Sequence, residues 1–337
     1  MLRSAFSARP RDLIPDIPVV ISRSALLATM LTAALGCDKA SSRAGAEASA
    51  QRGGGTTLDL SAQPTILFQL FGGGEDVRMI PVAAIRDRRI VRIVLSDAGW
   101  RRFDARYLRK GAQYTIYRDG RASGTVRVKR GMWEPGTSPL YDLPNCTLPT
   151  PIAAVTVDPL PLTATVELLA SNGDLASAHP TRSMTKEEIR LSGRTVAYRA
   201  GKAADLGRST LDSLDFEAIA VPTGVAAVPT LVAAFSDPAI GRTPVTVSTT
   251  AHLFVIADID SGGEYRPTYL QRMNGPVEIA EFRSYYDHLA LTGGPTDNIV
   301  LEGWHFGGDT FLSILGFDGG RWIEQFRSRT GWCIEEK

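Results

Sequence analysis

Short apolar runs, separated by glycine, proline and polar residues, recur along most of the chain, and this pattern predicts strands more often than helices. One clear signal lies near residue 120. Apolar runs at 113–117 and 124–128 flank Asp119-Gly120, a residue pair that favours the tight turn of a β-hairpin. We therefore expect two antiparallel strands there.

A helical period precedes this hairpin. Trp100, Phe103 and Tyr107 are spaced so that they lie on one face of a helix. Ser96 is a suitable N-cap for this helix, and Gly111 is suited to end it. The segment is therefore expected to form a single helix with one apolar face.

A second helix is predicted after residue 185. Thr185 and Glu188 have the spacing of a capping box, in which each side chain bonds the backbone N–H of the other residue. The helix should run from residue 186 towards residue 200, with Gly201 beyond it. The same segment contains Ser183-Met184-Thr185-Lys186, a match to the S-x-x-K motif of serine β-lactamases. Because no S-D-N or K-T-G motif accompanies it, we interpret the match as a by-product of the cap.

These signals divide the body of the chain into three zones. Residues 58–160 are expected to form a small α+β domain, and residues 161–243 an α+β segment with one clear helix. Residues 244–337 consist almost entirely of strand-like runs and turns, which predicts an antiparallel β domain, either a sandwich or a partial propeller. The fold class expected for the whole chain is therefore α+β and β-rich.

The start of the chain has a different pattern. Residues 24–36 contain no charged residue and follow Arg23. At about 13 residues this run is too short to span a bilayer, which needs about 20 apolar residues, and it fits the apolar region of a secretory signal. The long polar segment before it suggests that translation starts near Val19 or Val20, which would leave residues 1–18 unused.

The run ends in Ala33-Ala34-Leu35-Gly36-Cys37, which resembles the lipobox of bacterial lipoproteins. The departure from that pattern is Ala34, where the family prefers leucine. The resemblance implies cleavage of residues 1–36 as a signal peptide and attachment of lipid to Cys37, so that the protein would be anchored to a membrane of the cell envelope, periplasmic or otherwise extracytoplasmic. A plain secretory signal with an incidental cysteine is the alternative.

Residues 38–57 are rich in alanine, serine and glycine and contain no large apolar residue. Such a segment buries too little surface to offset the entropy of ordering it, so we expect a flexible tether.

The other two cysteines, Cys146 and Cys333, lie in turn-like contexts far apart in the sequence. An exported protein enters an oxidising compartment, which favours a disulfide between them. Two unpaired thiols remain the alternative, because pairing depends on geometry that the sequence does not give.

Composition narrows the classes further. The 337 residues are 44% hydrophobic and carry 37 Lys+Arg against 36 Asp+Glu, which excludes a disordered chain and a polytopic membrane protein. The charges are unevenly placed: residues 86–130 hold 14 basic and four acidic residues, and residues 251–337 hold seven basic and 13 acidic ones. The basic zone could face an anionic envelope polymer or lipid, or pair with the acidic zone. Nucleic acid is not expected as a partner, because no recognition motif is present.

Two segments of the last zone, 254–265 and 288–301, each have a strand-like run, a turn with two glycines and another apolar run. They resemble FG-GAP/VCBS-type repeats, whose acidic turns often bind calcium. The first turn keeps Asp258 and Asp260, but the second has Leu291 and Gly293 at ligand-like positions. Since calcium takes about six to eight oxygen ligands, we expect plain turns and neither a metal nor another cofactor.

Catalytic signatures are otherwise lacking in the sequence: it has no G-x-S-x-G, no H-E-x-x-H and no Walker motif. Asp287-His288 and the pair His305 and Asp309 place carboxylates near imidazoles along the chain, but a base needs a spatial arrangement. We therefore assign no catalytic residue. The expected role is binding or interaction in the cell envelope without catalysis; an exported hydrolase with an unrecognised site and a structural envelope spacer are the alternatives.

Overall fold

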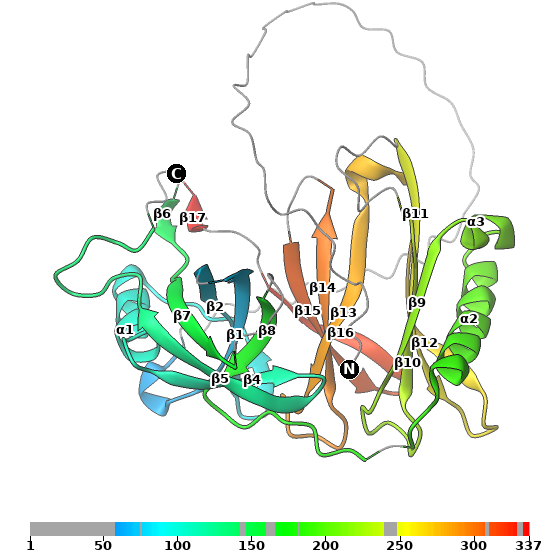
Figure 1. Ribbon diagram of the computed structural model, residues 1–337, viewed down its shortest axis with the longest axis horizontal. Coiled ribbons are helices and arrows are strands. Elements are labelled where there is room, and N and C mark those ends of the chain that lie inside the picture. The colour runs from blue at the N-terminus through cyan, green and yellow to red at the C-terminus, as the bar shows by residue number, and fades with distance from the viewer. Residues whose placement is uncertain are drawn as a thin grey trace, which may run out of the picture.

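The computed structural model describes residues 58–74, 76–141, 146–159, 166–180, 182–238, 248–306, 310–328 and 333–336. Strands outnumber helices in it, and every strand pairing is antiparallel, which confirms the expected β-rich α+β class (Figure 1). Cys37, the predicted signal peptide and the tether lie outside the described residues. No helix among the described residues has the length and apolar character needed to cross a bilayer.

The first sheet curls into a barrel. Its strands are β1 (Thr65–Gly73), β2 (Asp76–Arg86), β3 (Arg89–Val91), β4 (Gln113–Arg118), β5 (Arg121–Arg130), β7 (Ala153–Asp158) and β8 (Val166–Ser171). They are ordered β1-β8-β4-β5-β7-β2-β3, and a further pairing of β1 with β2 closes the ring, leaving β3 as an extension of β2.

Alternation along the strands fills the barrel. On β1, Ile66, Phe68 and Leu70 point into the core of the barrel, whereas Leu67 belongs to a different apolar cluster outside it. The predicted helix is α1 (Asp97–Tyr107), capped by the hydroxyl of Ser96. Its buried aromatic face packs against the barrel core, so this end of the ring is filled by helix side chains.

The predicted hairpin is confirmed as β4 and β5, joined at Asp119-Gly120. Both turn residues have positive φ, 51° and 72°, a conformation that asparagine, aspartate and glycine tolerate best. A side chain at Gly120 would also overlap the ring of His288, which packs directly on this turn. The hairpin therefore ends in a contact with the last third of the chain.

Two further sheets are four-stranded meanders. The first contains β9 (Asp215–Val221), β10 (Thr230–Ser236), β11 (Thr249–Ile259) and β12 (Tyr265–Pro276). The second contains β13 (Glu281–Leu289), β14 (Asn298–His305), β15 (Thr310–Asp318) and β16 (Arg321–Arg327). Short 3-10 turns, η1 (Leu60–Ala62) and η2 (Val277–Ile279), precede β1 and β13.

The elements stack in four layers (Figure 1). Helices α2 (Lys186–Ala203) and α3 (Arg208–Asp212) cover the outer face of sheet β9–β12, whose inner face packs on sheet β13–β16. The other face of sheet β13–β16 packs on the outside of the barrel. The central strands β10, β14 and β15 are therefore buried on both faces along most of their length.

The second predicted helix is confirmed as α2. Thr185 and Glu188 form the full capping box, and the helix continues beyond residue 200 to Ala203. Gly193 lets the helix approach the sheet, since a Cβ there would lie 2.8 Å from that of Ala218. Sheet membership crosses the expected zone boundaries at 161 and 244: β8 belongs to the barrel, and β9 and β10 pair in one sheet with β11 and β12.

The chain returns to the barrel at its C-terminal end. The short strand β17 (Cys333–Glu336) pairs with β6 (Cys146–Pro149), and the sulfur atoms of Cys146 and Cys333 lie at bonding distance, with Cα atoms 5.1 Å apart. The pair is separated by 187 residues in sequence, so the cross-link closes a loop that contains every element from β7 to β16. The expected pairing of these two cysteines is thus the one the fold brings together.

We predict that removing this cross-link destabilises the body strongly. In the chain-entropy account, a loop of this length corresponds to about 5 kcal/mol, and measured losses of native disulfides are about 2–5 kcal/mol. Cys146→Ser should lower the free energy of unfolding by that amount in urea denaturation, and mass spectrometry of unreduced peptides should find Cys146 linked to Cys333. A Cys146→Ser protein as stable as the parent, or free thiols at both positions, would contradict the prediction.

Candidate functional site

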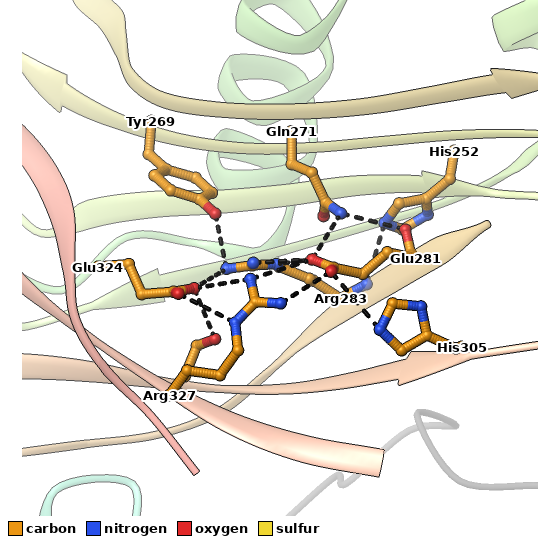
Figure 2. Close-up of polar contacts among 9 residues, drawn as sticks. His252, Tyr269, Gln271, Glu281, Arg283, His305, Glu324 and Arg327 are labelled. Atoms are coloured by element: carbon orange, nitrogen blue, oxygen red, sulfur yellow. Dashed lines mark hydrogen bonds and ion pairs between the residues drawn. The ribbon is translucent and has the colours of Figure 1, made fainter. Parts of the chain in front are cut away.

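The densest set of interacting charges among the described residues lies between the two meander sheets, and we call it the charge cluster: Glu281, Arg283, Glu324 and Arg327. The first two residues are on β13 and the last two on β16. Tyr269 and Gln271 reach it from β12, His252 from β11 and His305 from β14 (Figure 2). Residues from five strands of two sheets therefore meet at one point.

Local strand geometry places these four side chains on one face. Glu281 and Arg283 are two residues apart on β13 and so point to the same side of the sheet. Glu324 and Arg327 are three apart, which would put them on opposite sides of a regular strand. The register of β16 shifts between these residues, because Phe326 pairs with Ile314 and Glu324 pairs with Leu315. This β-bulge at Gln325 brings Glu324 and Arg327 to the same side.

Arg283 is the centre of the cluster, with a side chain only 5% exposed. Its Nη2 donates to Glu281 Oε1 at 2.7 Å, and its Nη1 lies 2.9 Å from Glu324 Oε2 and 2.7 Å from the hydroxyl of Tyr269. A buried guanidinium is costly unless such partners satisfy its N–H groups. Here carboxylates and a phenol surround it.

Arg327 completes a ring of alternating charge. It donates to both carboxylates, from Nη1 to Glu281 Oε2 and from Nε to Glu324 Oε1, each at 2.9 Å. Its carbonyl oxygen accepts from Arg92 of the barrel domain at 3.2 Å. The cluster therefore connects both meander sheets with the segment that follows β3.

The pairing determines the protonation of the carboxylates. Burial by itself would raise the pKa of Glu281, but the charges and hydrogen bonds of Arg283 and Arg327 outweigh it and hold the pKa below the usual 4.5. Burial acts in the same way on Glu324, and Arg327 together with Arg283 lowers its pKa as well. Both groups therefore remain ionised at neutral pH.

His252 lies beside the cluster and is fully buried. Its Nδ1 is 3.1 Å from the hydroxyl of Ser236, and its Nε2 accepts the backbone N–H of Arg283 at 3.3 Å. Burial lowers the pKa of His252 to about 4, so the imidazole is neutral at physiological pH. The neutral imidazole of His252, together with the hydrogen bonds of Tyr269 and Gln271 to Arg283 and Glu281, connects the two sheets at this point.

A second polar group lies where the barrel meets sheet β13–β16. His288 contacts the turn at Gly120, its Nδ1 is 2.7 Å from the hydroxyl of Tyr285, and burial lowers its pKa to about 4. Nearby, His179 Nε2 lies 3.5 Å from Oδ1 of the buried Asp297, whose pKa burial raises. This junction is the one place among the described residues where a histidine and a buried acid combine across domains.

The positions singled out from the sequence are distributed over the molecule. Asp287 accepts the backbone N–H of Gly120 at 2.9 Å, and His305 lies 3.7 Å from Glu281. Asp309, which lies four residues after His305 in the sequence, is outside the described residues. Ser183 precedes the capping box of α2 and has no role in the charge cluster.

The two acids of the calcium-like turn are also engaged. Asp258 is buried and accepts from Thr230, Thr268 and the indole of Trp322. Asp260 accepts the backbone N–H groups of Gly262 and Glu264, which fixes the turn between β11 and β12. Within the described ranges, no group of three or more His, Cys, Asp and Glu residues is placed to hold a metal ion.

Sequence reasoning missed the charge cluster. Its signal is present in retrospect: Glu281-Phe282-Arg283 puts two charges on alternate positions of a strand whose neighbours are core strands. Asp297 was also missed, because a polar residue after Gly293-Gly294 resembles an ordinary turn.

Comparison with known proteins returned nothing. No protein-family model matches the chain, no curated protein matches it, and no solved structure matches its fold.

We predict that breaking the charge cluster costs far more than breaking a surface pair. Arg283→Met removes the buried cation that Glu281 and Glu324 share and leaves the Tyr269 hydroxyl without this partner, so it should lower the free energy of unfolding by about 3–5 kcal/mol. Arg199→Met is the matched control, because its pair with Glu264 at 3.4 Å is more than half exposed and should contribute less than about 1 kcal/mol. Equal losses in urea denaturation would show that the cluster is not a stabilising centre.

We also predict that the protein loses stability in mild acid. His252 and His288 have folded-state pKa values of about 4 against an ordinary 6.5, so the unfolded chain binds more protons between these values. The contribution of each histidine to the free energy of unfolding should therefore fall as the pH drops from 6.5 towards 4, by about 2 kcal/mol between pH 7 and pH 5. The half-buried Glu217, whose pKa burial raises to about 7, acts in the opposite direction over this range.

Urea denaturation at a series of pH values checks this. His252→Gln should remove the contribution of this histidine and make the dependence less steep. The same pH dependence in His252→Gln as in the parent protein would refute the assignment of a neutral, buried imidazole.

Proposed function

We propose that the protein is exported, is anchored to a membrane of the cell envelope by lipid on Cys37, and works there by binding a partner or an envelope polymer without catalysis. The observation that supports export of the protein is the pairing of Cys146 with Cys333. Disulfides persist in oxidising compartments and are rare in the cytoplasm. The lipobox-like residues before Cys37 supply the anchor in this proposal.

The internal chemistry supports binding in preference to catalysis. Catalytic acids and bases work best when their pKa values lie near the working pH. In the charge cluster the pKa values of Glu281 and Glu324 are lowered, and that of His252 is about 4. The buried charges are therefore suited to hold two sheets in a fixed arrangement that presents outer surfaces to a partner.

The barrel supplies a candidate surface. The basic stretch 86–130 falls on β2, β3, α1, β4 and β5, and most of its arginines and lysines are exposed. An anionic envelope component would be attracted to this side of the molecule, since basic groups near an anionic surface each contribute about 1 kcal/mol. Sheet β13–β16 and the C-terminal strand carry the acidic excess.

The anchor is tested by labelling with a radioactive fatty acid in a bacterial host. The chain should take up the label, and Cys37→Ser should abolish it, because the thiolate of Cys37 is the only attachment point in the proposal. Cys146→Ser serves as the control and should leave labelling intact. Label that persists in Cys37→Ser would exclude lipidation at this residue.

The binding role is tested by retention of the Cys37→Ser chain on isolated envelope fractions, together with a screen for ester, peptide and glycoside hydrolysis. We expect retention and no turnover. Turnover that disappears in His179→Asn, whose imidazole pairs with Asp297, would favour an exported hydrolase. Absence of both retention and turnover would favour a structural spacer.

A further inference from the structure

A hollow lies at the α1 end of the barrel, beside Leu58, the first described residue. It lies between η1 and the first turns of α1 and has a volume of about 380 Å³. Leu58, Leu60 and Leu95 supply apolar surface, and Arg102 and Arg106 stand at its side. The hollow thus combines an apolar lining with two arginines and one carboxylate, that of Asp59, which accepts from the N–H and hydroxyl of Ser61.

Helix α1 is built to present those charges outwards. Trp100, Phe103 and Tyr107 bury one face in the barrel core, so Arg102 and Arg106 lie on the exposed face. Arg106 donates from Nη1 to the carbonyl of Leu60 at 2.6 Å, which fixes its guanidinium at the hollow. Among the described residues Arg102 has no hydrogen-bond or ion-pair partner, so its donors are available to a ligand.

The position of the hollow indicates its occupant. Leu58, in its lining, is the first described residue, and 20 residues separate it from Cys37. For the flexible tether expected from the composition of residues 38–57, the end-to-end distance is about 25 Å, so a lipid on Cys37 in the proposed anchoring would keep this end of the barrel near the bilayer. The nearest abundant molecule with a negative headgroup and an apolar body is then a membrane phospholipid.

We propose that this hollow binds the headgroup of an anionic phospholipid in the membrane that holds the tether. The lipid phosphate pairs with Arg102 and Arg106, and the glycerol and upper acyl carbons lie against Leu60 and Leu95. Guanidinium groups recognise phosphate through paired, charge-assisted hydrogen bonds. The inference rests on the proposed anchoring, and it adds an orientation: the α1 end faces the bilayer and the α2 end projects away from it.

The molecule supplies a matched control. Helices α2 and α3 lie at the opposite end from α1 (Figure 1). A second hollow there, of about 500 Å³, is lined by Tyr198, Lys202 and Arg208. It is also basic and partly apolar, but nothing links it to the tether. Changes in the two hollows remove the same charge from opposite ends of the body.

The test is vesicle co-sedimentation of the full chain carrying Cys37→Ser, so that no attached lipid supplies binding. Vesicles contain phosphatidylglycerol and phosphatidylcholine, or phosphatidylcholine alone. The preference for the anionic vesicles should fall about 30-fold when Arg102→Gln and Arg106→Gln are combined, about fivefold for each arginine. Lys202→Gln with Arg208→Gln should change it less than twofold, and Arg106→Lys should retain most of it. Thermal unfolding of each variant verifies the fold.

Equal losses in the two double variants would mean that net charge alone drives attachment, and would overturn the site. An unchanged vesicle preference in the variant that combines Arg102→Gln and Arg106→Gln would also overturn the site. The same holds if this variant binds vesicles normally and loses only its retention on an anionic polysaccharide column. Acyl labelling of Cys37 is a separate readout. If the chain takes up no acyl label but still prefers anionic vesicles, the lipid anchor is contradicted and the headgroup site is supported. If the chain is labelled but shows no preference for anionic vesicles, the headgroup site is contradicted and the anchor is supported.

Discussion

Sheet β13–β16 is buried on both faces, and the arrangement of the other layers depends on that burial. Val300 and Ile314 face the barrel, and Ile299 and Leu315 face sheet β9–β12. An apolar sheet with two buried faces needs a covering layer on each side, and the barrel and the second meander provide them. The order of layers follows from this requirement.

The charge cluster lies within one of those two interfaces. Burying the guanidinium of Arg283 costs free energy that only close pairing with its partly exposed partners offsets, so the cluster favours one relative placement of the sheets. Hydrophobic contact between flat sheets has little directional preference, whereas the hydrogen bonds of Arg283 with the Tyr269 hydroxyl and of its backbone N–H with His252 join specific positions of the two sheets. The bulge at Gln325 is part of the same device, because it aligns Glu324 with Arg327.

The two ends of the described body differ in a way that bears on function. One end has α1, the basic stretch and the entry of the chain at Leu58, and the other end has α2 and α3. The cross-link between β6 and β17 ties the C-terminal segment back to the barrel, so the body is held together as one unit.

The sequence by itself determined the local elements. Helix α1, helix α2 with its capping box, and the β4–β5 hairpin follow from signals within a few residues: Ser96, Thr185 with Glu188, and Asp119-Gly120. The β-rich class and the candidate pair of cysteines were also predictable, because periodicity and residue type carry that information.

Only the tertiary structure decided the closed barrel, the layer order and the charge cluster. Closure depends on pairing β1 with both β2 and β8. Strand β8 lies about a hundred residues after β1 in the sequence. The cluster joins residues near 252, 269, 283 and 327, and Glu324 with Arg327 shares a face only because of a bulge. Local spacing records which way a side chain points along its own strand, but which strand lies opposite is determined by the packing of the whole chain.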